Sequence, residues 1–368
     1  MNKIPPVDLA RQYRSISEET EIAVLKILSS GYYVGGAAVT DFEKDFADYT
    51  GVNHCIACNS GTDALYLALR ALNIGTGDEV ITSPFTFIAT AEAVTMTGAK
   101  PVFVDIDLDT FNLDLTQVKN AITPNTKAII PVHLFGQPVN MTQLMEIAIA
   151  HKIYVIEDCA QATGASWNGQ KVGSIGHIGC FSFFPTKNLG ACGDGGAVTT
   201  NDSEIASQVK MLREHGSSVR YRHDVMGINS RLDALQAAIL QVKLRYLDQW
   251  NQQRQAVANR YQELLSPLPN LKLPQAILGG HHVWNQYTIM ISHRDEVREK
   301  LQQMGVISMV YYPIPLQLQP VYQDLGYQIG QLPNSEQASY EVLSLPMFPD
   351  LTIEEQQQVV YCLKDCLS

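Results

Sequence analysis

Lys187 is the residue whose surroundings most clearly suggest chemistry. It lies in FSFFPTKNLGACGDGG, between an aromatic run and a glycine-rich turn, and the nearest acidic residue is Asp194. A lysine in such surroundings loses solvation, so it must reach water with its amine, lower its pKa, or be consumed in a covalent bond. Ser182 precedes it at the end of the same predicted strand.

A second group of residues predicts an anion site. Ser60, Gly61 and Thr62 follow the strand-like HCIAC and open the helix-like GTDALYLALRAL. Hydroxyls and free N–H groups converge there at the positive end of a helix dipole, which favours a phosphate. A hydroxyl before a helix is also commonly a plain N-cap, so this group alone does not decide between the two interpretations.

A third group ends the strand-like IYVIED, which closes with Glu157 and Asp158. A carboxylate at the mouth of a buried strand is costly unless it meets a cation, although it can also cap the next helix. A phosphate cradle, a carboxylate at a strand end and a desolvated lysine together predict a site for pyridoxal 5′-phosphate (PLP).

Each part of such a site has a defined task. The lysine amine forms a Schiff base with PLP, the carboxylate keeps the pyridine nitrogen protonated, and the helix N-terminus holds the phosphate. Phe87, in SPFTFIAT, could stack on the ring, although a phenylalanine in this pattern is more often a core residue.

The elements that position these residues form an alternating pattern. Between residues 50 and 200, short β-branched runs alternate with helical patterns, which predicts a mainly parallel sheet flanked by helices. Ligands of such sheets bind at the carboxyl ends of the strands, where the candidate residues collect. Residues 1–240 are therefore expected to form a large PLP-binding domain with an N-terminal arm.

The rest of the chain predicts a second lobe. The segment from about Ser230 to Leu265 has helical spacing without internal glycine or proline and reads as a long, bent helix that links two lobes. Shorter strand-like and helix-like runs follow it. Residues 241–368 are expected to form a small α+β C-terminal domain.

Composition excludes several classes of function. With 37 acidic and 26 basic residues among 368, the net charge of −11 argues against nucleic acid and anionic membranes as partners. No signal peptide or membrane span is evident, so a cytoplasmic protein is expected. The seven cysteines suit reduced core thiols, and Cys55 and Cys58 would point to opposite faces of a strand.

Motifs along almost the whole chain resemble one family. They include VDLARQY, SGTDALYLAL, GDEVITSPFTFIATAEAV, KAIIPVHLFGQP, VIEDCAQATGA, FSFFPTKNLGACGDGGA, GINSRLDALQAAIL and SLPMFP. In this order they are similar to the DegT/StrS family of PLP-dependent nucleotide-sugar aminotransferases. The resemblance implies the aspartate-aminotransferase-type fold, which is PLP fold type I, and a homodimer with active sites at its interface.

The resemblance also implies roles for individual residues. Lys187 would carry the Schiff base and shuttle the proton, and Asp158 would face the pyridine nitrogen. Gln161 would lie against the ring or its phenolic oxygen, and Phe87 would stack on the ring.

Further residues would bind the phosphate. Gly61, Thr62 and Ser182, with Ser60 beside them, would hold it from one subunit. Asn229, in GINSR, matches an asparagine that in this family reaches the phosphate from the neighbouring subunit.

The implied reaction moves an amino group from L-glutamate, which leaves as 2-oxoglutarate, to a keto sugar on a nucleoside diphosphate. Asp194, in GDGG, favours the subgroup that aminates C3 of a 3-keto sugar, such as a 3-keto-6-deoxyhexose. A related sugar dehydratase has histidine where this chain has Lys187. A regulatory protein that keeps the fold without catalysis is a further alternative.

Other residues leave open questions. Gln317 replaces a histidine that many relatives carry in PLHLQ, which could alter the sugar. Arg220, Arg222 and His223 could bind a pyrophosphate or form a solvated basic loop. His133 is expected to be a hydrogen-bonded structural residue. A nicotinamide-dependent oxidoreductase does not fit, because the first turn reads NSGTDA rather than GxGxxG.

Overall fold

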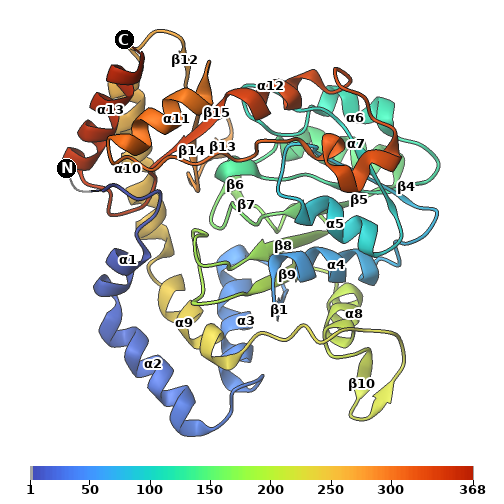
Figure 1. The fold of residues 1–368 in the computed structure, drawn as a ribbon. Coiled ribbons are helices and arrows are strands. Elements are labelled where there is room, and N and C mark those ends of the chain that lie inside the picture. Colours follow the sequence, from blue (N-terminus) through green and yellow to red (C-terminus); the bar gives the residue numbers. More distant parts are fainter. Residues whose placement is uncertain (1–2, 368) are drawn as a thin grey trace.

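The computed structural model describes residues 3–367, and a seven-stranded sheet forms its centre (Figure 1). The strand order is β1-β9-β8-β5-β4-β2-β3, and the strands from β8 to β3 pair in parallel. Strand β9 runs antiparallel between β1 and β8, so the expected mainly parallel, mixed sheet is confirmed. The strands are β1 (His54–Cys58), β2 (Glu79–Thr82), β3 (Lys100–Phe103), β4 (Thr126–Ile130), β5 (Tyr154–Asp158), β8 (Ile178–Ser182) and β9 (Gly196–Thr200).

Helices cover both faces of this sheet, because successive side chains of each strand point in opposite directions. In β1, Cys58 packs in one buried cluster and Cys55 in another, as the sequence predicts, and both thiols are free. The helices of this lobe are α3 (Ala37–Thr50), α4 (Gly61–Ala71), α5 (Ala89–Met96), α6 (Leu115–Ala121), α7 (Met141–His151), α8 (Ser203–Arg213) and α9 (Ala234–Leu244).

A smaller lobe packs around a three-stranded antiparallel sheet of order β12-β14-β15. Its buried cluster includes Tyr261, Tyr287 and Leu301, and Ile4 from the start of the chain joins it. The elements are α10 (Leu247–Leu265), β12 (Leu271–Lys272), β14 (Tyr287–Ile291), α11 (Arg294–Gln303), η2 (Leu316–Leu318), η3 (Pro320–Leu325), α12 (Pro333–Glu341), β15 (Val342–Leu345) and α13 (Ile353–Leu367).

The expected long bent helix consists of two helices, α9 and α10, that meet at Arg245 and Tyr246. The two lobes also share a buried cluster in which Phe85 and Val132 meet Met290. The division at residues 240 and 241 stays a prediction. No helix within residues 3–367 has the length and apolar character to cross a membrane.

The N-terminal arm consists of α1 (Leu9–Ser15) and α2 (Ser17–Ser30) and lies along the left and lower edge of Figure 1. Arg11 fixes it to the start of α13, because its guanidinium bonds both carboxylate oxygens of Glu355 and the carbonyl of Asp350, with Nη–O distances of 2.7–3.0 Å. The guanidinium also lies 5.4 Å from the ring centre of Phe348. The VDLARQY motif therefore anchors the arm.

Short elements complete the fold. Strands β6 and β13 pair beside β7, and β10 and β11 form a hairpin that projects at the lower right of Figure 1. Their bounds, with one short helix, are η1 (Leu134–Gly136), β6 (Ser166–Trp167), β7 (Gln170–Lys171), β10 (Ser217–Val219), β11 (Arg222–His223) and β13 (Gly280–His281).

Candidate active site

Asp158 is the last residue of β5 and is only 4% exposed. Its Oδ2 accepts a 2.8 Å hydrogen bond from the Thr90 hydroxyl, and its Oδ1 accepts a 3.1 Å bond from the Ala160 N–H. Burial raises the pKa of Asp158, whereas these hydrogen bonds and the positive charge of Lys187 lower it. Within residues 3–367, no lysine, arginine or histidine forms an ion pair with this carboxylate, so it is suited to meet the cationic group of a ligand.

Lys187 follows β8 in a turn in which its N–H donates to the carbonyl of Phe184. Burial lowers the pKa of its amine to about 8, and the charge of Asp158 acts in the opposite direction. At that pKa roughly one amine in ten is neutral at pH 7, far more than for an ordinary lysine. Within the described part of the chain the amine has no hydrogen bond or ion pair, so a nucleophilic nitrogen is available.

The turn that carries Lys187 is held by a buried amide network that the sequence analysis missed. Asn188 donates to Asn251 Oδ1 at 2.7 Å and to the carbonyl of Val283 at 2.9 Å. Its own Oδ1 accepts a 2.8 Å bond from Asn285 Nδ2. The network ties the turn to α10 and to the segment before β14. An asparagine directly after the lysine, in an otherwise apolar run, was the available sequence signal.

Gln161 lies beside these residues and is 8% exposed. Its Oε1 accepts a 2.6 Å bond from the Phe135 N–H, which fixes the amide so that Nε2 donates to the hydroxyl of Tyr312 at 3.2 Å. Tyr312 is a further residue that the sequence analysis did not single out. Burial, followed by the charge of Asp158, raises the pKa of its phenol, so the hydroxyl keeps its proton.

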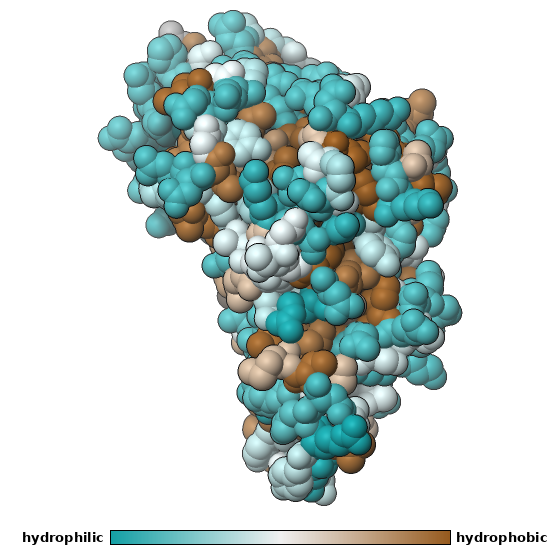
Figure 2. Space-filling view, turned by 90° about the vertical axis from the view of Figure 1, so that its right-hand side faces the viewer, coloured by the Kyte–Doolittle hydropathy of each residue, from teal (hydrophilic) through white to brown (hydrophobic). Residues whose placement is uncertain are grey.

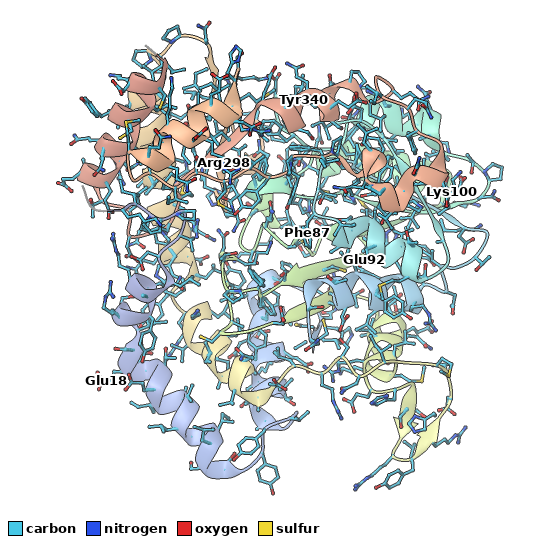
Figure 3. All side chains as sticks on the ribbon, viewed as in Figure 1. Glu18, Phe87, Glu92, Lys100, Arg298 and Tyr340 are labelled. Atoms are coloured by element: carbon cyan, nitrogen blue, oxygen red, sulfur yellow. The ribbon has the colours of Figure 1, made fainter. Side chains whose placement is uncertain are left out.

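Phe87 is 58% exposed, whereas Phe85 two residues earlier is fully buried. The core interpretation of Phe87 is therefore wrong, and its neighbour Phe85 is the core residue. The Phe87 ring lies 6.2 Å from that of Tyr312 at an interplanar angle of 38°. In Figure 3, Phe87 lies near the middle of the molecule, just before α5, whereas Glu18 lies at the left edge on the N-terminal arm. An exposed aromatic face at this position can take a planar ligand.

Helix α4 begins where the sequence predicts an anion site. Ser60 is its N-cap, with Oγ accepting a 3.1 Å bond from the Asp63 N–H, so the N-cap interpretation of Ser60 is confirmed. The N–H groups of Gly61 and Thr62 have no acceptor within residues 3–367. These two donors therefore face a position where a phosphate oxygen would satisfy them.

Ser182, the last residue of β8, lies close to the N-terminus of α4. A Cβ on Gly61 would fall 2.7 Å from Ser182 Cβ, and one on Gly196 would fall 2.4 Å from the carbonyl carbon of Ser60. Both positions therefore need glycine, and the strand ends close around the N-terminus of α4. The structure thus brings Ser60, Gly61, Thr62 and Ser182 together.

Asn229 is exposed, and its side-chain oxygen accepts a 3.0 Å bond from Arg231 Nε. The next residue, Ser230, is buried and donates a 2.6 Å bond to Asp63 in the first turn of α4. The GINSR segment is therefore fixed at the start of α4. A phosphate contact of Asn229 across a subunit interface stays a prediction.

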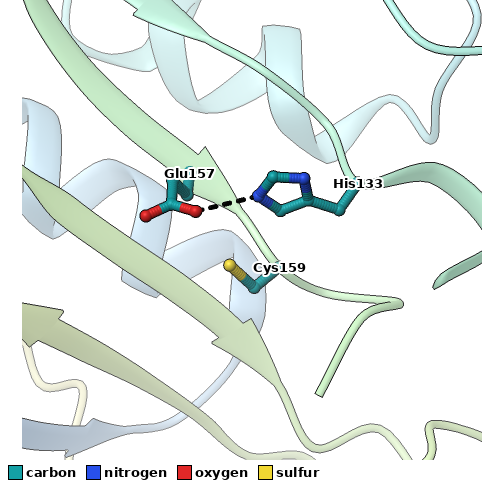
Figure 4. A group of neighbouring side chains, drawn as sticks. All are labelled: His133, Glu157 and Cys159. Atoms are coloured by element: carbon teal, nitrogen blue, oxygen red, sulfur yellow. Dashed lines mark hydrogen bonds and ion pairs between the residues drawn. The ribbon is translucent and has the colours of Figure 1, made fainter. Parts of the chain in front are cut away.

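His133, Glu157 and Cys159 form a buried group at the end of β5 (Figure 4). His133 Nε2 lies 3.0 Å from Glu157 Oε2, and His133 Nδ1 accepts a 3.0 Å bond from the Val139 N–H. Glu157 Oε1 accepts from two backbone N–H groups, and burial raises the pKa of the Cys159 thiol. His133 and Glu157 are hydrogen-bonded to each other and to the backbone, so the structural interpretation of His133 is confirmed.

Four other candidate residues from the sequence have exposed side chains. Arg220, Arg222 and His223 occupy the exposed β10–β11 hairpin, where Arg222 pairs with Asp224 at 2.9 Å. Their exposure agrees with a solvated basic loop, and a contact with a pyrophosphate stays a prediction. Asp194 is also exposed.

Gln317 is 2% exposed, and neither atom of its amide has a partner within residues 3–367. The loop that carries it contacts the segment before α5, because the Leu316 N–H donates to the carbonyl of Pro84 at 2.8 Å. A polar group from outside the chain would satisfy this amide.

The arrangement fits PLP in each of its parts. The α4 N-terminus with Gly61 offers free N–H donors for a phosphate, Asp158 offers a buried carboxylate for a protonated ring nitrogen, and Lys187 offers a largely desolvated amine. Residues suited to hold each reactive part of the cofactor therefore come from the ends of β1, β5 and β8, at the edge where ligands of such sheets bind.

Comparison with known proteins agrees with this fit. Two curated relatives cover almost the whole chain: a "Pleiotropic regulatory protein" of Geobacillus stearothermophilus (49% identical, 97% of this chain and 96% of that protein) and a UDP-N-acetyl-3-dehydro-alpha-D-glucosamine 3-aminotransferase of Acidithiobacillus ferrooxidans (48%, 99% and 98%). The solved structure of S. venezuelae DesV in complex with a ketimine intermediate superposes with a TM-score of 0.97 at 42% identity, covering 99% of this chain and 98% of that one.

The model of the DegT/DnrJ/EryC1/StrS aminotransferase family matches residues 14–364. The expected fold type, the PLP cofactor and the aminotransferase class are thereby confirmed. The chain belongs to the DegT/DnrJ/EryC1/StrS aminotransferase family.

Proposed function

We propose that the protein transfers an amino group from L-glutamate to C3 of a keto sugar that is attached to a nucleoside diphosphate. The observation that carries this proposal is that Lys187, whose amine has a pKa of about 8, and the buried carboxylate of Asp158 act electrostatically on each other. Bound PLP supplies the electron sink and carries the amino group between the two substrates.

The residues of the chain transfer protons and hold the cofactor in place. With PLP bound, Lys187 Nζ would take the proton from the α-carbon of the amino donor and hand it to the cofactor, and in the second half of the reaction it would move a proton from the cofactor to the acceptor carbon, so one amine is both base and acid. Its lowered pKa makes both protonation states accessible near neutral pH. Asp158 holds positive charge at the ring nitrogen, and Gln161 and Phe87 orient the ring.

The acceptor is inferred from the relatives and from the chain. The A. ferrooxidans relative is named for amination at position 3 of a UDP-linked sugar. Asp194, in GDGG, agrees with the same regiochemistry. Glutamate is the proposed donor because it is the usual donor of the family that this chain resembles.

The function is tested with the enzyme loaded with pyridoxamine phosphate and a panel of UDP- and dTDP-linked sugars with the keto group at C3 or C4. A 3-keto sugar is expected to accept the amine at least roughly 100-fold faster than its 4-keto isomer, because a misplaced carbonyl loses its hydrogen-bond partners. Product mass and NMR identify the aminated carbon. Preference for a 4-keto sugar would overturn the regiochemistry, and failure of every keto sugar would point to another acceptor.

The proposed functional unit is a homodimer with shared sites. Ile22 and Leu25 of α2 are 63% and 62% exposed, more than an isolated chain would be expected to leave to water in one helix. A groove of about 990 Å³ lies between α2, α3 and α9, lined in part by Ala23, Ile27 and Val242. Figure 2 shows hydrophobic patches among the hydrophilic residues on another side of the molecule. A second copy that covers such surfaces would bring its Asn229 to this active site.

Mixed dimers test whether Asn229 acts across the interface. Lys187→Ala and Asn229→Asp subunits, each inactive alone, are expected to regain activity when combined. If each site uses lysine from one subunit and asparagine from the other, one site of every mixed dimer is intact, so about half of the sites in purified mixed dimers recover. The mixed dimers are isolated with two affinity tags and assayed for turnover. Absence of recovery would place both residues in a site built from one subunit.

A regulatory role without catalysis is the second candidate, because the G. stearothermophilus relative is named a pleiotropic regulatory protein. Lys187, Asp158 and Gln161 argue for catalysis, since a purely regulatory protein has no need of an amine with a lowered pKa beside a buried carboxylate. A visible absorbance band that disappears when glutamate is added would decide for the enzyme.

The proposed location is the cytoplasm. All seven cysteines are free, including the exposed Cys192, as expected in a reducing compartment.

A further inference from the structure

Two buried threonines, one before α5 and one within it, form a chain of hydrogen bonds that ends at the carboxylate of Asp158. Thr90, in the first turn of α5, is 1% exposed, and its hydroxyl donates to Asp158 Oδ2 at 2.8 Å. Thr86 is 3% exposed, and its Oγ1 lies 3.2 Å from Thr90 Oγ1. Thr90 is described above only as a hydrogen-bond donor to Asp158, and Thr86 has not been considered.

The direction of these hydrogen bonds follows from the charge of Asp158. An ionised carboxylate only accepts, so the Thr90 proton points at Asp158, and the proton between the two hydroxyls must come from Thr86. The result is a donor chain from Thr86 through Thr90 to Asp158. Linked hydrogen bonds of one direction strengthen each other in a low-dielectric interior.

We propose that Thr90, supported by Thr86, is a positioning residue that keeps Asp158 ionised and oriented toward the protonated ring nitrogen of PLP. This inference rests on the proposed role of Asp158 in the aminotransferase.

The electrostatics of Asp158 agree with this role of Thr90. Burial is the largest influence on Asp158 and raises its pKa, and the Thr90 bond is the largest opposing one. Other titratable groups also act on this carboxylate or respond to it: Lys187, His133, Tyr312, Cys159 and Cys180. The Thr90 hydroxyl is neutral, so its hydrogen bond to Asp158 does not depend on the protonation state of Lys187.

The test compares four variants. Thr90→Val removes the hydroxyl at nearly constant volume, Thr90→Ser keeps it, and Thr86→Val removes only the outer donor. Thr95→Val is the matched control, because the Thr95 hydroxyl lies on the same helix but donates to the carbonyl of Ala91. Each apoprotein is titrated with PLP, the visible band of the bound cofactor is followed against pH, and the single-turnover rate with glutamate is measured.

Thr90→Val is expected to weaken PLP binding by roughly tenfold to hundredfold, because a hydrogen bond to a charged group is lost. The pH midpoint of the bound cofactor should shift in the same variant. Thr86→Val should show a smaller loss, of about two- to fivefold, and Thr90→Ser and Thr95→Val should stay near wild type.

The outcomes separate this inference from the proposed function. Wild-type PLP affinity and an unchanged pH midpoint in Thr90→Val would overturn it, as would Thr90→Ser behaving like Thr90→Val in a folded protein. Circular dichroism establishes folding for each variant. PLP binding and the glutamate half-reaction need no sugar, so an incorrect sugar assignment leaves this test intact.

Discussion

Replacing Lys187 with alanine is expected to abolish turnover while the fold and part of the PLP affinity remain. General acid–base catalysis by a positioned side chain contributes roughly 10²- to 10⁴-fold, and here the covalent role is lost as well, so a fall of at least about 10³-fold is expected. The visible band of covalently bound cofactor should disappear. Turnover with glutamate and a keto-sugar nucleotide, together with the absorption spectrum, measures both effects.

The matched control is Lys171→Ala. Burial also lowers the pKa of Lys171, but its amine lies 3.0 Å from the ring centre of Tyr49, in a different part of the protein. This variant should keep its spectrum and turnover. Normal turnover and an unchanged spectrum in Lys187→Ala would contradict the assignment of the active site.

The same amine gives the wild-type apoprotein a defined pH dependence. Only the neutral amine attacks a carbonyl, and burial lowers the pKa of Lys187 from 10.5 to about 8. The rate of covalent PLP attachment should therefore rise with pH up to about 8 and level off above it. An ordinary lysine would give a rate that still rises toward pH 10.

Much of the site could be predicted from sequence because its residues share a local rule. Asp158, Ser182 and Ser60 each end or follow an apolar strand-like run, and parallel strands bring such ends to one edge of a sheet. Residues at the ends of neighbouring parallel strands therefore lie close together. The resemblance to a known family added roles to these positions.

The remainder of the site depends on packing between distant segments. Asn188 meets Asn251 and Asn285, which lie on α10 and before β14, and nothing in the local sequence identifies these partners. Tyr312 reaches Gln161 from the other lobe for the same reason. Such contacts follow from how the lobes dock, which no local periodicity encodes.

Phe85 and Phe87 show that the spacing of residues in the sequence does not predict which side chain of a loop is buried. Both lie in SPFTFIAT, two residues apart, and only the structure shows that the first is buried against Phe111 and Phe135 while the second is exposed. Alternation places them on one face of an extended segment, but the chain turns into α5 directly after them. Three-dimensional context therefore decides which ring can meet a ligand.

Replacing Asp158 with asparagine is expected to have the second-largest effect. Asparagine has nearly the same shape and can still accept from Thr90 or Ala160, but it carries no charge, so the cofactor's ring nitrogen loses its counter-ion. Charge stabilisation of this kind typically contributes roughly 10²- to 10³-fold to turnover, and a loss of that size is expected. PLP affinity should fall as well. Stopped-flow rates of the glutamate half-reaction and titration of the apoprotein with PLP measure the two losses.

Glu157→Gln is the informative control because it changes the neighbouring buried carboxylate on the same strand. Glu157 accepts from His133 and from the backbone N–H groups of Ile175 and Gly176, on the side of β5 away from Asp158. Loss of the Glu157 carboxylate disturbs a buried hydrogen-bond network and should lower the thermal unfolding temperature. The PLP affinity of Glu157→Gln should stay near wild type. If Glu157→Gln and Asp158→Asn lost PLP affinity equally, the carboxylate of Asp158 would have no specific role at the ring nitrogen. If only Asp158→Asn loses PLP affinity, the loss comes from the missing charge of Asp158. It then does not come from a general destabilisation of β5, which carries both residues.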